Sequence, residues 1–191
     1  MNLDIDIDSI IQRIRNGDKQ AFAEIVVHYQ RPLFGFLGRM AIHQGLAEEI
    51  AQETFIRAWS RLAEYQPDRA AFSTWLFTIA RNLALNELTR AASVHEQSAG
   101  DDLPDVSADQ TSEPPQPLQA LLASEQTQQL EAALHQLNAQ DRSVIGLAYV
   151  QELDMAAIAR IEGESLSVVK TRLHRAKDKL RKLMEKRYAT H

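Results

Sequence analysis

The spacing of apolar residues is helical over most of the chain. Apolar positions recur at intervals of three and four, whereas alternation with a period of two over strand lengths is scarce. Intervals of three and four place side chains on one face of an α-helix. The sequence therefore predicts an all-α protein, with two helical domains on either side of a proline-containing stretch in the middle of the chain.

Capping residues suggest where the first helices begin. Asp8 and Asp18 are placed to cap helices over residues 9–16 and 19–30, because a short acidic side chain can accept from the free N–H groups of the first turn. Pro32 is expected to open a third helix, since proline is tolerated at the first helical position.

The segment LAEEIAQETFIRAWSRLAEY, residues 46–65, predicts a helix with two unlike faces. The apolar face of its helical wheel holds Leu46, Ala47, Ile50, Ala51, Thr54, Ala58 and Leu62. The polar face and its border hold Glu49, Gln52, Glu53, Phe55, Ile56 and Trp59. Ile56 is an apolar residue among acids and amides, and this pattern predicts a docking surface for a basic partner. The glutamates would be explained equally well if this face were only an ordinary solvent-exposed surface.

The next helical segment, FSTWLFTIARNLALNELTRA, carries candidate nucleic-acid contacts. Its polar side holds Arg81, Asn82, Asn86 and Arg90, and such side chains hydrogen-bond base edges and phosphates. Trp75, with Phe72 and Phe77 nearby, could stack on bases that have left a duplex. The alternative is that these aromatic residues belong to the core, as most aromatic residues at helical spacing do.

A helix-turn-helix is predicted near the C-terminus. Asn138 and Asp154 are placed to cap two helices, Gly163 lies in a short turn, and Ser165 or Ser167 can cap the helix that follows. In this last helix a stripe at steps of four and three is expected to be buried; it consists of Val169, Leu173, Ala176, Leu180 and Leu183.

The last helix is also strongly basic. Residues 166–187 hold nine Lys or Arg and two acids, although the chain has a net charge of -5. The candidate DNA-binding residues of this helix are Ser167, Lys170, Thr171, Arg172, His174 and Arg175. Short polar groups can approach base edges while basic ones hold phosphates. A basic helix can also lie on a membrane, but such helices have a bulkier apolar face than this one.

Composition divides the chain into three parts. Residues 93–117 hold six acids, four prolines and no Lys or Arg, which is typical of a mobile tether with too few apolar residues to offset its ordering entropy. We therefore expect an N-terminal domain over residues 1–92, an acidic linker over 93–117 and a C-terminal domain over 118–191.

Composition also argues against catalysis. The chain has no cysteine and six histidines scattered along it, and it contains neither a glycine-rich phosphate loop nor a paired-histidine metal motif. We therefore expect no enzyme activity, no cofactor and no metal site. The N-terminus resembles neither a signal peptide nor a transmembrane span, so the expected location is cytoplasmic.

Three motifs together resemble the extracytoplasmic-function sigma factors, the compact two-domain group of the sigma-70 superfamily. LAEEIAQETFIRAW resembles the region-two helix, WLFTIARNLALNELTR the segment that reads the minus-ten element, and LNAQDRSVIGL with AAIARIEGESLSVVKTRLHRAKDKLR the region-four helix-turn-helix. The resemblance implies that Glu49, Gln52, Glu53, Phe55 and Trp59 contact the clamp helices of the polymerase beta-prime subunit. It also implies that the last helix binds the minus-thirty-five element.

The resemblance further implies control by an anti-sigma factor, often anchored in a membrane. The sequence as a whole is also similar to a family member that functions in cobalt and nickel resistance. This similarity implies a metal-resistance operon as the target. One alternative remains open at this point. An ordinary helix-turn-helix regulator, with N-terminal helices that sense a ligand or dimerise, would show the same C-terminal pattern.

Overall fold

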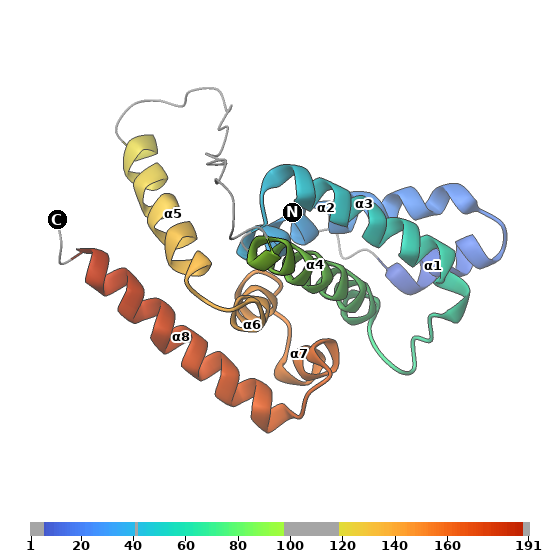
Figure 1. The fold of residues 1–191 in the computed structure, drawn as a ribbon. Helices are drawn as coiled ribbons and strands as arrows, with labels where there is room; N and C mark the ends of the chain where they lie inside the picture. Colours follow the sequence, from blue (N-terminus) through green and yellow to red (C-terminus); the bar gives the residue numbers. More distant parts are fainter. Residues whose placement is uncertain (1–5, 41, 98–118, 189–191) are drawn as a thin grey trace.

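The computed structural model describes residues 6–40, 42–97 and 119–188, and every regular element within these ranges is a helix. The all-α prediction is therefore confirmed. The α-helices are α1 (Ile7–Arg15), α2 (Phe22–Arg39), α3 (Gln44–Ser60), α4 (Phe72–Gln97), α5 (Gln119–His135), α6 (Ala139–Tyr149), α7 (Met155–Glu162) and α8 (Leu166–Tyr188) (Figure 1). Two short 3-10 helices, η1 (Lys19–Ala21) and η2 (Leu62–Glu64), complete the fold.

The helices form two groups that touch each other. Helices α1 to α4 pack together in the N-terminal half, and α8 packs against α5, α6 and α7 in the C-terminal half (Figure 1). The two halves meet where α6 packs against α2 and α7 packs against α4. The C-terminal helices therefore lie directly on the N-terminal ones.

The predicted apolar face of α3 is buried in the N-terminal core. Ala47, Ile50, Ala51, Thr54 and Ala58 are all buried there, and the hydroxyl of Thr54 donates to the carbonyl of Ile50. Each large apolar side chain buried in such a core contributes roughly 1.5–3 kcal/mol. Burial of this face orients the opposite face of α3 towards solvent.

Two expectations for the N-terminal helices are wrong. Asp6, not Asp8, caps α1 and accepts from the backbone N–H of Ser9 at 3.1 Å. Pro32 lies inside α2 and does not open a new helix. The buried residues of α2 on both sides of the proline continue one apolar face, and their burial outweighs the cost of about 3 kcal/mol for an interior proline. Asp18 does cap η1, as predicted.

The end of α4 differs from the predicted start of the linker. The helix continues to Gln97, so residues 93–97, which we assigned to the linker, are helical. These five residues contain no proline, so nothing in them stops a helix that already has a stable preceding turn. The rest of the predicted linker, residues 98–117, lies outside the described residues.

The predicted helix-turn-helix is present in the C-terminal half. Asn138 caps α6 and Asp154 caps α7, each by accepting from a backbone N–H at 2.7 Å. Gly163 ends α7 with a φ of 68°, a left-handed conformation that glycine adopts without steric cost. The hydroxyl of Ser165 accepts from Val168 N–H at 3.4 Å at the start of α8. Across the ranges described above, no helix is long and apolar enough to cross a membrane.

Candidate nucleic-acid interface

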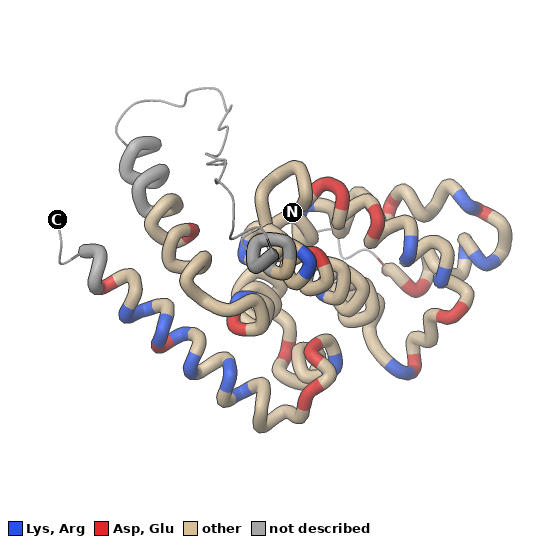
Figure 2. The backbone as a smooth tube through the Cα atoms, in the orientation of Figure 1, with Lys and Arg blue, Asp and Glu red and all other residues tan. Residues whose placement is uncertain are grey.

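Helix α8 presents a basic surface that faces away from the core. Val169 and Ala176 are buried beneath it, which turns the opposite side of the helix to solvent. Ser167, Lys170, Thr171, His174 and Arg175 are all exposed on that side. Figure 2 shows Lys and Arg residues following α8 along its length. Five of the six residues predicted on this helix therefore share one accessible surface.

Arg172 is the exception among the six. Its side chain is only 17% exposed, and its guanidinium pairs with the carboxylates of Glu162 and Glu164, each at 3.3 Å. Glu162 ends α7 and Glu164 lies in the turn, so Arg172 ties α8 to the preceding helix. In this structure Arg172 supports the turn and is not free on the outer surface.

A shallow groove of about 530 Å³ lies where the first turn of α6 meets the first turns of α8. It is lined by Asn138, Gln140 and Asp141 from α6 and its cap, and by Ser167, Val168, Thr171, Arg172 and Arg175 from α8. Asn138 and Gln140 were not predicted to be functional. The capping role of Asn138 was readable in the sequence, but the position of both residues beside α8 depends on how the helices pack.

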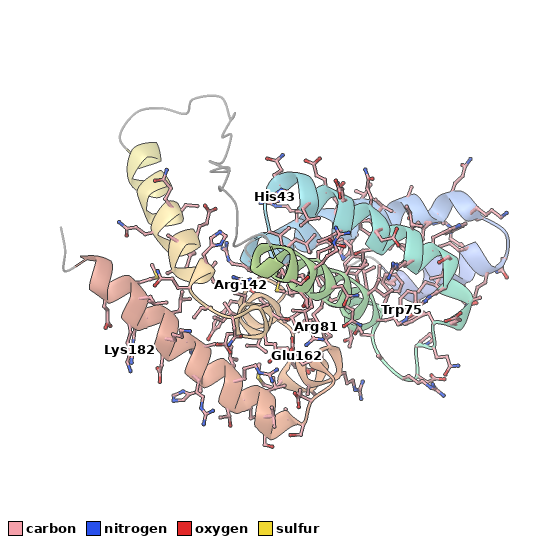
Figure 3. All side chains as sticks on the ribbon, viewed as in Figure 1. His43, Trp75, Arg81, Arg142, Glu162 and Lys182 are labelled. Atoms are coloured by element: carbon pink, nitrogen blue, oxygen red, sulfur yellow. The ribbon has the colours of Figure 1, made fainter. Side chains whose placement is uncertain are left out.

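The polar side of α4 is split by the contact between the two halves. Asn82, Asn86 and Arg90 are exposed, whereas the side chain of Arg81 is only 13% exposed. Arg81 Nη2 lies 2.8 Å from Glu162 Oε2, and Figure 3 shows the two residues together where α4 meets α7. Arg90 pairs with Glu87 one turn earlier. Three of the four polar candidates are therefore accessible.

The aromatic residues of α4 belong mostly to the core. Phe72 and Phe77 are buried, with 3% and 1% of their surface exposed, so neither can stack on a base. Trp75 is half-buried, and its ring packs 5.3 Å from that of Tyr65 and 5.5 Å from that of Phe72. Base stacking is thus restricted to the accessible part of Trp75.

The candidate docking surface on α3 is accessible to a partner. Glu49 and Gln52 are exposed, and Glu53 is half-buried and pairs with Arg57. Ile56 is 60% exposed, so its side chain is available for apolar contact with a partner.

The two aromatic candidates lie at the border of this surface, as expected. Trp59 is 39% exposed, and its ring packs edge-on against Phe22 at 5.1 Å. Phe55 is half-buried. The contact with Phe22 holds the indole in place while leaving part of it open to solvent. The α3 surface therefore presents a positioned aromatic ring next to an exposed isoleucine.

The described residues contain no group of three or more His, Asp or Glu placed to hold a metal ion.

Comparisons with known proteins agree with the division into two helical halves. Residues 25–94 match the family model for sigma-70 region 2, and residues 127–180 match the model for sigma-70 region 4. Over 175 residues the chain is 31% identical to the ECF RNA polymerase sigma factor SigW of Bacillus subtilis, covering 90% of this chain and 93% of that protein. It is 30% identical to the ECF RNA polymerase sigma factor RpoE of Cereibacter sphaeroides, covering 92% and 93%.

Solved structures share the fold. One is CnrH in complex with the cytosolic domain of CnrY, with a TM-score of 0.65 and 22% identity over 92% of this chain and 95% of that one. Another is the sigma factor RpoE in complex with the anti-sigma factor NepR from Bartonella quintana, with a TM-score of 0.67 and 22% identity over 86% and 96%. At this level of identity the likeness concerns the fold alone.

Proposed function

Because the chain belongs to the extracytoplasmic-function sigma factors of the sigma-70 superfamily, we propose that it directs core RNA polymerase to specific promoters and helps to separate the DNA strands there. The observation that carries this proposal is the exposed basic face of α8 in a helix-turn-helix whose turn is formed by Gly163. Such a helix places short polar groups near base edges and basic groups near phosphates. The chain acts through binding and carries out no catalysis of its own.

The α3 surface is the proposed contact with core polymerase. Exposed Ile56 and Trp59 supply apolar anchors, and Glu49, Gln52 and Glu53 supply a polar and acidic surround. This arrangement fits the general anatomy of a protein interface, with an apolar centre and a polar rim. Its charge suits a basic partner surface such as the clamp helices of the beta-prime subunit.

The two halves have different roles in promoter binding. We assign the minus-ten element to the exposed polar side of α4, with Asn82, Asn86 and Arg90, and the minus-thirty-five element to α8. Two modest DNA-binding surfaces held on one polymerase gain from a high effective concentration. Neither surface therefore needs high affinity for DNA alone. This suits a chain with a net charge of -5, because a negatively charged protein has only weak general attraction to DNA phosphates.

An anti-sigma factor is the proposed regulator. One solved structure of the same fold is the sigma factor RpoE bound to the anti-sigma factor NepR. Another is CnrH bound to the cytosolic domain of CnrY. We propose a comparable partner for this chain, anchored in the membrane, and a cytoplasmic location for the chain itself. Control of a metal-resistance operon stays a prediction that rests on resemblance alone.

Runoff transcription with purified core polymerase tests the proposed function. The chain plus core enzyme is expected to give promoter-dependent product from templates drawn from its own genome, whereas core enzyme alone gives none. The absence of product from every candidate promoter would contradict the proposal. A stand-alone regulator would instead bind its DNA specifically and tightly without polymerase, and gel shifts of the chain alone measure that difference.

A further inference from the structure

A cluster of aromatic rings holds the first turn of α4 in place. Trp75 lies in this turn, near the end of α4 where the chain enters from η2 (Figure 3). The centre of the Tyr65 ring lies 5.3 Å from that of Trp75 and 5.4 Å from that of Phe72. Tyr65 is 3% exposed, whereas Trp75 is half-buried. The orientation of the accessible part of Trp75 therefore depends on the position of Tyr65.

Two short-range hydrogen bonds shape the chain around Tyr65. The backbone N–H of Tyr65 donates to the carbonyl of Leu62 at 3.2 Å, where η2 ends. The hydroxyl of Tyr65 donates to the carbonyl of Ala70 at 3.1 Å. Both bonds lie within residues 62–70, so they bend the segment before α4 but do not themselves attach it to another helix.

Arg15 supplies an attachment to another helix. Its Nη2 atom donates to the carbonyl of Tyr65 at 2.8 Å, a bond between residues 50 positions apart. Arg15 is the last residue of α1, and the buried side chains of Ile10 and Ile11 fix α1 to the core. A charged donor makes a stronger hydrogen bond than a neutral one. Arg15 therefore fixes the backbone of Tyr65 relative to the core, and with it the ring against which Trp75 packs.

Stacking on a base that has left the duplex is strongest when the aromatic surface is already in place, because little ordering is then needed on binding. We propose that Arg15 is a positioning residue for strand separation: it holds Tyr65, and Tyr65 holds the indole of Trp75 in the orientation that stacks on an unpaired base. Arg15 acts through these two residues and not by contact with the base. Its role in strand separation rests on the proposed function, whereas its effect on Trp75 can be measured without DNA.

Tryptophan fluorescence measures the positioning of Trp75 in the free chain. The chain has two tryptophans, so Trp59→Phe leaves Trp75 as the single one. In this background Arg15→Met removes the donor and keeps an unbranched stem, whereas Arg15→Lys keeps a charged donor. Loss of one hydrogen bond shifts the balance between packed and displaced rings, so Arg15→Met should raise the quenching of Trp75 by acrylamide roughly twofold. Arg15→Lys should restore most of the original value. Unchanged quenching in Arg15→Met would overturn the proposal.

Arg13→Met is the matched control on the same helix. Arg13 pairs with Asp18 and Glu24, and all three side chains are largely exposed. These ion pairs do not involve the segment before α4, so Arg13→Met should leave the quenching of Trp75 at its original level. Equal increases for Arg13→Met and Arg15→Met would show a general loosening of α1 and would overturn the assignment of Arg15.

Binding to partly unpaired DNA tests the consequence for strand separation. The probe is a promoter fragment identified by runoff transcription, with its minus-ten segment unpaired by mismatches and labelled with an adenine analogue whose fluorescence falls on stacking. In the complex with core polymerase, Arg15→Met should lower the affinity for this fragment about fivefold and reduce the fall in fluorescence. Its affinity for a fully paired fragment that carries only the minus-thirty-five element should stay unchanged. Equal losses of affinity for the two fragments would show a general effect on the fold and would overturn the proposal.

Removal of the indole shows whether Arg15 acts through Trp75. Trp75→Leu keeps an apolar side chain and removes the stacking surface. In that background Arg15→Met should cause no further loss of affinity for the unpaired fragment, because the contact that it supports is already absent. The same fivefold loss in the Trp75→Leu background would overturn the proposal.

Circular dichroism checks the helix content of these variants. If Trp75→Leu lowers it, the comparison of Arg15→Met with Arg15→Lys decides alone, both by quenching and by binding to the unpaired fragment. Failure of the unaltered chain in runoff transcription would reject the proposed function and leave the quenching result standing.

Discussion

Arg172 and Arg175 lie three positions apart on α8 and have different surroundings. Arg175 is exposed beside the groove between α6 and α8, whereas Arg172 is held by two glutamates. A side chain that already has charged partners must give them up before it can bind a phosphate. We therefore assign direct phosphate contact in the assembled complex to Arg175 and Lys170 first.

Replacing Arg175 with alanine should weaken promoter binding by the polymerase complex about fivefold and lower its salt dependence by about one phosphate contact. Lys182→Ala is the matched control, because Lys182 is an exposed basic residue nearly two turns further along the same helix (Figure 3). Filter binding over a range of salt concentrations measures both effects. Equal losses for the two variants would show that α8 contributes only general charge.

Trp59 is the residue of α3 best placed to anchor polymerase. Truncation of a positioned aromatic anchor in an interface can cost about 2 kcal/mol or more, so Trp59→Ala should weaken binding to core polymerase roughly thirtyfold. Phe55→Ala should weaken it less, because Phe55 is the more buried of the two. Val27→Ala removes an apolar side chain that is 66% exposed on α2 and serves as the control. Normal core binding by Trp59→Ala would contradict the assignment of the α3 surface.

The stability of the N-terminal half should fall at alkaline pH because of Tyr29. Burial, with a smaller effect of the Tyr65 charge, raises the pKa of Tyr29 to about 12, whereas an unfolded chain has a tyrosine pKa of about 10. The folded state holds the proton more tightly, so this contribution is complete below about pH 10 and is lost as the pH rises towards 12.

Unfolding by denaturant at several alkaline pH values measures this effect, and Tyr29→Phe should make the free energy of unfolding less dependent on pH. Part of the dependence should remain, because burial also raises the pKa of Tyr65. An unchanged pH dependence in Tyr29→Phe would contradict the assignment.

At the scale of the elements, the turn between α7 and α8 depends on one backbone conformation. Gly163 has a φ of 68°, where any residue with a Cβ atom incurs a steric cost of roughly 1–2 kcal/mol. Its position has open space around it, so the cost comes from the backbone and not from packing. The direction in which α8 leaves the turn, and with it the position of the basic face, depends on this residue.

Gly163→Ala should therefore lower the free energy of unfolding by about 1 kcal/mol, and Gly163→Asn should lower it less, because asparagine tolerates the left-handed conformation. Gly38→Ala provides a contrast, since Gly38 lies in α2 with no positive φ and alanine there should stabilise the helix by roughly 0.5–1 kcal/mol. Chemical denaturation of the three variants measures these differences. A stabilising effect of Gly163→Ala would show that the turn relaxes to another conformation.

At the scale of the whole molecule, the basic and acidic surfaces lie on different halves. A run of basic residues follows α8, whereas the candidate polymerase surface on α3 carries glutamates; the N-terminal helices also hold Lys and Arg, among many acids (Figure 2). This separation suits the proposed function, in which one half contacts a protein and both halves contact a nucleic acid. The contact between the halves buries the charge of Glu162 away from solvent.

Promoter binding by the polymerase complex should depend strongly on salt. The basic residues of α8 are exposed, and phosphate contacts made by exposed Lys and Arg weaken as the salt concentration rises. The affinity for promoter DNA should therefore fall steeply between about 0.05 and 0.2 M salt, which a binding titration at several salt concentrations measures. An affinity that stays constant over this range would contradict the proposed phosphate contacts.

The sequence alone predicted the features that depend on local chemistry. The buried face of α3, the caps at Asn138 and Asp154 and the glycine turn at Gly163 were all readable, because helical periodicity and capping involve residues only a few positions apart. The helix-turn-helix and the exposed face of α8 followed from them. Two local features were mispredicted. Pro32 lies inside α2 because the packing of that helix outweighs the cost of the proline. Asp6, and not the nearby Asp8, caps α1, and the sequence alone did not distinguish these two aspartates.

Only the tertiary structure decided which candidate side chains are free. Arg81 and Glu162 are 81 positions apart in sequence, and no local pattern indicates that one buried carboxylate binds arginines from two helices. Asn138 likewise joins the groove beside α8 only because α6 packs there. Helix formation depends on neighbours in the chain, whereas the pairing of charges depends on which helices meet.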